Sequence, residues 1–114
     1  MNKATNTLKI FIGYDSHETI AYHVLCQSIL EKASRPVQFM PINLNNLKNI
    51  FSRDRNQLQS TEFSFSRFLV PYLSNYEGWS LFMDCDMLAL DDFSELFDLA
   101  DPSKAVMVCK HNYE

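Results

Sequence analysis

Asp84 and Asp86 are the residues whose type and spacing best suit chemistry. They flank Cys85, directly after the hydrophobic run 79–83. Side chains two residues apart on an extended segment point the same way, so both carboxylates can face one site. Two like charges so close repel each other, and a divalent cation relieves that cost. Carboxylate oxygens suit Mg²⁺ or Mn²⁺, which also coordinates phosphate oxygens. The pattern predicts a metal-linked phosphate site, with an inert acidic turn as the alternative for so short a motif.

The segment before Asp15 and the one after it predict a strand and then a helix. The β-rich run Leu8–Ile12 ends at Gly13, and Asp15 and Glu18 have the spacing of a capping box. Apolar residues then recur at the spacing of one helix face: Ile20, Ala21, Val24, Leu25 and Ile29.

A second strand is predicted over Val37–Ile42, after Ser34-Arg35-Pro36 ends the helix. Pro41 indicates an edge strand or a strand end. The order strand, helix, strand normally gives parallel strands and an α/β fold. The polar residues 43–59 predict a short helix and a mobile loop.

The second half of the chain continues this pattern. Thr61 is expected to cap a helix that runs to about Tyr76 and is kinked by Pro71, with one apolar face: Phe65, Phe68, Leu69, Tyr72 and Leu73. The run Trp79–Met83 is continuously hydrophobic, as central parallel strands are. A short helix over 93–99 follows Asp91-Asp92, and a strand is predicted over 105–109. Because the chain stops at Glu114 without a closing helix, we expect a fragment of a longer α/β domain.

Composition limits the classes of function. The 114 residues suit one domain over 1–114, with 46% hydrophobic residues and a net charge of -4. The Lys and Arg residues are scattered, which disfavours nucleic-acid binding. No apolar run approaches the ~18 residues of a membrane span, the N-terminus does not look like a signal peptide, and the three cysteines suit neither a disulfide framework nor a zinc ribbon. A cytoplasmic location is expected. The only two glycines, Gly13 and Gly78, cannot supply a Gly-rich phosphate loop.

Two segments, 66–73 and 79–97, resemble glycosyltransferase family 8 and its bacterial relatives. The shared pattern is an Arg-bearing helix with an internal proline, a hydrophobic strand, D-x-D, an acidic turn and a Leu/Phe-rich helix. The run Ile10–Asp15 also looks like the family's first strand and uridine-contacting loop. The resemblance covers residues 8 to 110.

This resemblance implies a Rossmann-like GT-A fold, with a mostly parallel sheet flanked by helices. It implies transfer of a hexose from a nucleoside-diphosphate sugar, commonly a UDP-sugar, to an acceptor hydroxyl with retention at the anomeric carbon, using Mn²⁺ or Mg²⁺. Asp84 and Asp86 carry over as metal ligands, with Asp84 also near the ribose or sugar. Arg67 carries over as a donor-binding residue, and Tyr14 and Asp15 would meet the uracil and ribose.

Simpler roles remain open for several of these residues. Arg67 would serve equally as a surface arginine, Asp15 as a helix N-cap and Tyr14 as a packing residue. Cys85 is expected to point away from the two acids, as a small core residue. Family members use a further metal-ligating histidine far downstream, beyond the end of this chain. We expect the histidines present to be surface or core residues: His17, His23 and His111.

Two other functions fit the motif. A phosphatase of the haloacid-dehalogenase type would use Asp84 as nucleophile and Asp86 as acid and base. That motif usually closes the first strand of its domain, and only Lys104 and Lys110 follow it here as partner lysines. The other alternative is a non-catalytic, truncated domain that folds or binds nucleotide without transferring anything.

Overall fold

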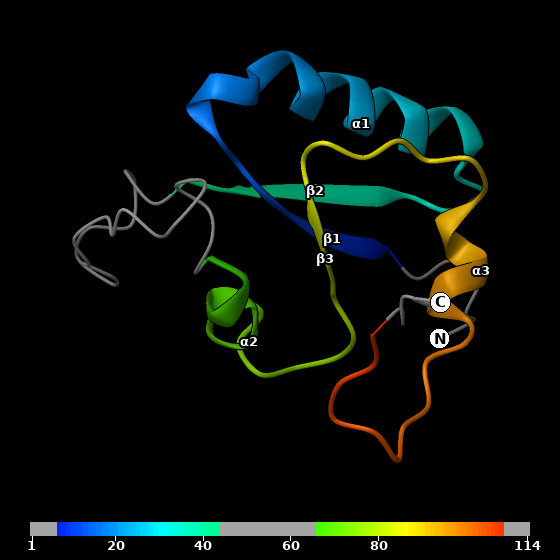
Figure 1. Cartoon of the computed structure of the whole chain (residues 1–114). Coiled ribbons are helices and arrows are strands. Elements are labelled where there is room, and N and C mark those ends of the chain that lie inside the picture. The colour runs from blue at the N-terminus through cyan, green and yellow to red at the C-terminus, as the bar shows by residue number, and fades with distance from the viewer. Residues whose placement is uncertain (1–6, 44–65, 109–114) are drawn as a thin grey trace, which may run out of the picture.

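The strand β1 (Leu8–Gly13) forms the centre of a three-stranded parallel sheet, between β2 (Val37–Ile42) and β3 (Leu81–Asp84). The computed structural model describes residues 7–43 and 66–108. The parallel pairing confirms the prediction of an α/β fold, and Figure 1 shows helices on both sides of the sheet.

The helix α1 (Thr19–Lys32) follows a 3-10 turn, η2 (Ser16–Glu18), and lies along one side of the sheet (Figure 1). Alternate residues of β1 point toward it, because successive side chains of a strand face opposite sides. The resulting core holds side chains from β1, α1, β3 and the segment after β3: Ile10, Ile12, Leu25, Ile29, Met83, Cys85 and Ala89.

The predicted apolar face of α1 is confirmed at Leu25 and Ile29 and is wrong at Ile20 and Val24. Ile20 is 80% exposed and Val24 50% exposed, whereas Ser28 is buried. A small polar residue is tolerated on the buried face because its hydroxyl is fully used. Ser28 Oγ donates to Leu25 O at 2.8 Å and accepts from Ala89 N at 2.9 Å. The segment after β3 therefore packs directly on α1.

The run before the D-x-D motif forms a strand as predicted, with the continuous hydrophobicity that is typical of central strands. Among the described strands β3 lies at one edge of the sheet and β1 in the middle. Its hydrophobicity is continuous because Leu81 and Met83 pack into the core beneath α1 while the intervening Phe82 is half-buried on the other face. The second strand has the predicted bounds, and its position at the opposite edge agrees with Pro41.

The region around Pro71 is helical over a shorter span than predicted. It consists of a 3-10 turn, η4 (Ser66–Leu69), and a single α-helical turn, α2 (Val70–Leu73), on the side of the sheet away from α1 (Figure 1). Pro71 stands in the first turn of α2, where a proline has no amide hydrogen bond to lose. Phe68 and Tyr72 of the expected apolar face are exposed, and the proposed cap Thr61 lies outside the described residues.

The last described segment contains α3 (Phe93–Phe97), capped by Asp92 and shorter than predicted. The strand predicted over 105–109 is wrong for 105–108, which form a bend and coil with exposed side chains, and Cys109 lies outside the described residues. The helix and loop predicted for 43–59 fall almost entirely outside them as well. No helix within 7–43 or 66–108 is long and apolar enough to cross a membrane.

Candidate functional site

The carboxyl edge of the sheet brings together four of the five residues that the sequence predicted for the site. Gly13, the last residue of β1, is paired in register with Asp84, the last residue of β3. The chain continues from β1 into Tyr14-Asp15 and from β3 into Cys85-Asp86. Ligands of open α/β sheets bind at this edge, where the strands end and loops begin.

Asp15 is a buried N-cap. Only 3% of the residue is exposed, and its Oδ1 accepts from the His17 backbone N–H at 2.9 Å. The predicted capping box forms only in this half, because the carboxylate of Glu18 accepts from Cys85 instead. The N-cap role of Asp15 is confirmed, and its contact with a ribose stays a prediction.

Tyr14 is held in place by its neighbours on η2 and α1. Its hydroxyl shares a hydrogen bond with Thr19 Oγ1 at 2.8 Å. Its ring meets Tyr22 edge to face, with centroids 5.6 Å apart and planes at 80°. The packing role is confirmed, and the half-buried ring is fixed at the edge of the sheet before any ligand arrives.

The two acids of the D-x-D motif differ in their surroundings. Asp84 still belongs to β3 and is half-buried, whereas Asp86 lies in a bend beyond the strand and is exposed. The argument that residues two apart point the same way requires an extended backbone, so it does not apply to Asp86. Asp84 lies on the face of the sheet opposite the α1 core, next to Gly13, which has no side chain to compete for that space.

Cys85 is fully buried in the core beneath α1, as predicted. Its Sγ donates to Glu18 Oε2 at 3.3 Å. Burial, then the hydrogen bond to Glu18 and the charge of that carboxylate, raise the pKa of the thiol to about 11. At neutral pH Cys85 therefore stays protonated and acts as a hydrogen-bond donor, since the thiolate is the nucleophilic form.

The donor chemistry of Asp84 and Asp86 fits a hard divalent cation. Mg²⁺ is usually bound by one or two carboxylates and completes its coordination with water and substrate phosphates. Over residues 7–43 and 66–108, no group of three or more His, Cys, Asp and Glu side chains is arranged to hold a metal ion.

The other candidate residues have side chains that are exposed or that lie outside the described residues. Arg67 lies in η4, and its side chain is outside the part of the chain described. His17 and His23 are exposed, as expected of surface histidines, and His111 falls outside the described residues. Lys104 is exposed, and its backbone N–H donates to Asp101 O. Lys110 falls outside the described residues.

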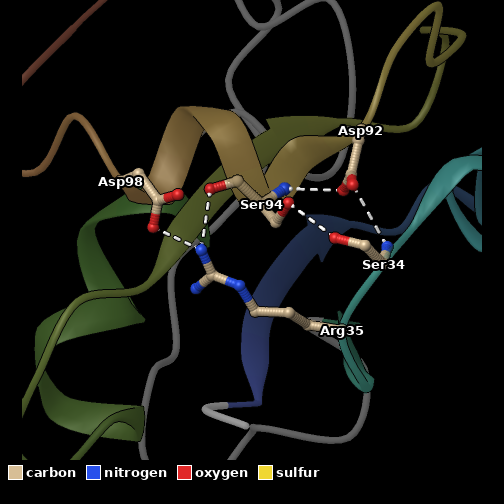
Figure 2. A network of polar contacts seen from close by, with 5 residues as sticks. All are labelled: Ser34, Arg35, Asp92, Ser94 and Asp98. Carbon is tan, nitrogen blue, oxygen red and sulfur yellow. Dashed lines mark hydrogen bonds and ion pairs between the residues drawn. The ribbon is translucent and has the colours of Figure 1, made fainter. Parts of the chain in front are cut away.

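A second polar network lies at the start of β2, around the turn between α1 and β2 (Figure 2). Asp92 accepts from Ser94 N at 2.9 Å and from Ser34 N at 3.2 Å, and the hydroxyls of Ser34 and Ser94 share a bond of 3.0 Å. Arg35 donates to Ser94 O at 3.2 Å and pairs with Asp98. We call these five residues the α3 clamp, because they hold α3 against the turn before β2.

Neither the α3 clamp nor the bond between Glu18 and Cys85 was predicted. Their partners are about sixty residues apart, and local spacing carries no signal for such contacts. The residue types gave only a weak hint, since Ser34-Arg35 and Asp91-Asp92 were interpreted as a helix end and an acidic turn.

Comparison with known proteins shows a similarity that extends over most of the chain. The chain is 50% identical over 107 residues to Protein CDI of Arabidopsis thaliana. The match covers 92% of this chain and 41% of that protein, so the chain spans less than half the length of the curated relative. No protein-family model matches the sequence, and no solved structure matches it.

Proposed function

We propose that this chain is the nucleotide-sugar-binding part of a metal-dependent glycosyltransferase with a GT-A fold. The observation that supports this most is the register of Gly13 with Asp84. This register puts the loop after β1 beside the D-x-D turn, at the end of a parallel sheet where ligands of such folds bind. Each of these segments resembles a part of glycosyltransferase family 8.

In this proposal different side chains bind different parts of the nucleotide-sugar donor. Asp84 and Asp86 hold Mn²⁺ or Mg²⁺, which when bound supplies Lewis-acid neutralisation of the departing diphosphate. Tyr14 and Asp15 line the uracil and ribose, and Arg67 offsets diphosphate charge. The bond between the hexose and the diphosphate breaks, and a bond to an acceptor hydroxyl forms with retention of configuration.

The donor is proposed to be a nucleoside-diphosphate sugar, most simply a UDP-sugar, and no nucleic-acid partner is proposed. A reducing, cytoplasmic compartment is proposed as the location because Cys26 and Cys85 both carry free thiols.

The test is calorimetry and thermal melting of the 114-residue chain with Mn²⁺, with UDP and with both. We expect the two ligands together to raise the melting temperature by more than the sum of the separate shifts, because each strengthens binding of the other. Asp84→Asn and Asp86→Asn should abolish this synergy while leaving the melting temperature without ligand nearly unchanged.

Asp91→Asn is the matched control. Asp91 is exposed and its Oδ1 accepts from Asp92 N at 2.8 Å, a bond that asparagine also makes. Synergy that is retained in both Asp84→Asn and Asp86→Asn would refute the assignment of these two residues as metal ligands. Hydrolysis of a generic aryl phosphate by the unaltered chain would instead support the phosphatase. Binding of UDP and Mn²⁺ without transfer of sugar from a UDP-sugar to any acceptor hydroxyl would support the non-catalytic role.

A further inference from the structure

We propose that Glu18 is a positioning residue for the metal site, acting on Asp84 and Asp86 through Cys85. This role rests on the proposed function above. It assigns a task to a residue that is not itself a metal ligand and that stands 66 and 68 positions away from the two acids.

The bond between Glu18 and Cys85 joins two separate segments at the carboxyl edge. Cys85 Sγ donates to Glu18 Oε2 at 3.3 Å, and the main chain of Asp15 hydrogen-bonds to the same sulfur. Glu18 is anchored in turn, because its backbone N–H donates to Asp15 O at 2.9 Å. The residue between the two acids is thus fastened from the side of η2 and by the core beneath α1.

The D-x-D turn depends on this fastening. The regular pairing of β3 with β1 ends at Asp84, and residues 85 and 86 form a bend outside the sheet. Asp84 and Asp86 repel each other until a cation is bound. A fixed Cys85 limits how far that repulsion can spread the turn. Residues that orient metal ligands commonly change metal affinity by about 10- to 100-fold when they are replaced.

A direct role for Glu18 as a third metal ligand is the competing explanation. The observed geometry disfavours it, because one carboxylate oxygen faces the buried thiol and no three-residue metal group occurs in the described part of the chain. The two roles make opposite predictions for glutamine. A glutamine at this position still accepts the thiol proton through its carbonyl oxygen but is a poor substitute for a charged ligand.

The experiment measures binding of Mn²⁺ by electron paramagnetic resonance, with and without UDP, in variants of the 114-residue chain. We expect Glu18→Ala to weaken UDP-linked Mn²⁺ binding about tenfold and Glu18→Gln to stay within about threefold, since a neutral acceptor keeps most of a hydrogen bond. Glu31→Ala, which alters an exposed glutamate at the other end of α1, should change nothing.

A double-mutant cycle separates positioning from general destabilisation. Cys85→Ala should weaken Mn²⁺ binding as Glu18→Ala does, and the double variant should be no worse than either, because both remove one bond. Cys85→Ser keeps a donor and should retain binding, which guards against a failure of Cys85→Ala to fold.

The outcomes are separable. Unchanged Mn²⁺ affinity in Glu18→Ala, or a loss in Glu18→Gln as large as in Glu18→Ala, would overturn the positioning role while the proposed function stands. Absence of UDP-linked Mn²⁺ binding in the unaltered chain would overturn the proposed function and this role together.

Discussion

Gly13 and Asp84 lie opposite each other at the ends of two parallel strands, β1 and β3. Both positions lie on the face of the sheet away from the α1 core, where Gly13 contributes no side chain next to Asp84. Gly13 has no positive φ angle, unlike Gly78 at 67°. Its value at this position therefore lies in its size and not in its backbone freedom.

Replacing Gly13 should damage the site in proportion to the size of the new side chain. Gly13→Val places two methyl groups beside Asp84, and we expect it to weaken binding of Mn²⁺ with UDP by more than Gly13→Ala does. Calorimetry gives the two affinities, and circular dichroism checks that the strand still forms. Equal affinities across glycine, alanine and valine would show that no ligand approaches Asp84 from this side.

The buried hydroxyl of Ser28 fastens the segment after β3 to α1. Ser28→Ala leaves the buried Ala89 N–H without its acceptor, so the free energy of unfolding should fall by about 1–3 kcal/mol. Ser74→Ala removes only an exposed hydroxyl bond to Pro71 O, which water can replace, and should cost less than about 0.5 kcal/mol. Urea unfolding compares the two, and similar losses would argue against a structural role for Ser28.

Asp92 should make the stability of the chain depend on acid pH. Hydrogen bonds from Ser34 and Ser94 lower the pKa of Asp92 from 3.8 to about 2. The folded state therefore releases this proton more readily than the unfolded chain does. The ionised Asp92 carboxylate stabilises the fold above pH 3.8, and this stabilisation is lost as the pH falls toward about 2.

Asp92→Asn should accordingly destabilise the protein at neutral pH and have a smaller effect as the pH approaches about 2. Thermal melts of both proteins across the range measure the difference. Asp91→Asn serves again as the control, because Asp91 accepts from a single backbone donor within the described residues, Asp92 N. A difference that does not vary with pH would show that the bonds of the α3 clamp do not depend on charge.

Arg35 should be the residue of the α3 clamp that matters most for α3 itself. The side chain is only 9% exposed and contacts both Ser94 O and Asp98. A five-residue helix has little stability of its own, so Arg35→Met should lower the free energy of unfolding by about 1–3 kcal/mol and speed hydrogen exchange in α3. Lys104→Met, at an exposed lysine, should change neither. Slow exchange in α3 of Arg35→Met would refute this account.

The sequence was a good guide to elements whose pattern is local. The strand over 37–42 has the predicted bounds, α1 begins close to the proposed cap, and the parallel order follows from the strand–helix–strand arrangement. The prediction failed where burial depends on a distant partner. Ser28 is buried because Ala89 reaches it, and Val24, four positions earlier on the helix, stays exposed.

The candidate site also combines features that the sequence could predict with contacts that it could not. Asp84 and Asp86 could be selected from residue type and strand position, and Tyr14 and Asp15 from the resemblance to glycosyltransferase family 8. The sheet brings the two segments together. The hydrogen bonds that hold them could not, because the partner of Cys85 is 67 residues away in the sequence. Helix-face patterns at Phe68 and Tyr72 misled for a further reason, since a single helical turn preceded by a 3-10 turn does not keep the periodicity of a long α-helix.

Pro41 has an effect on how the sheet can grow. Leu8 N and Tyr14 N donate to the carbonyls of Pro36 and Ile42, so even-numbered residues of β2 turn their backbone groups toward β1 and odd-numbered ones turn theirs outward. Pro41 is among the outward residues and has no N–H to offer. An incoming strand would find one rung of the ladder missing on this flank, which protects it from self-association. Extension by further strands is therefore favoured beyond β3, next to the two acids.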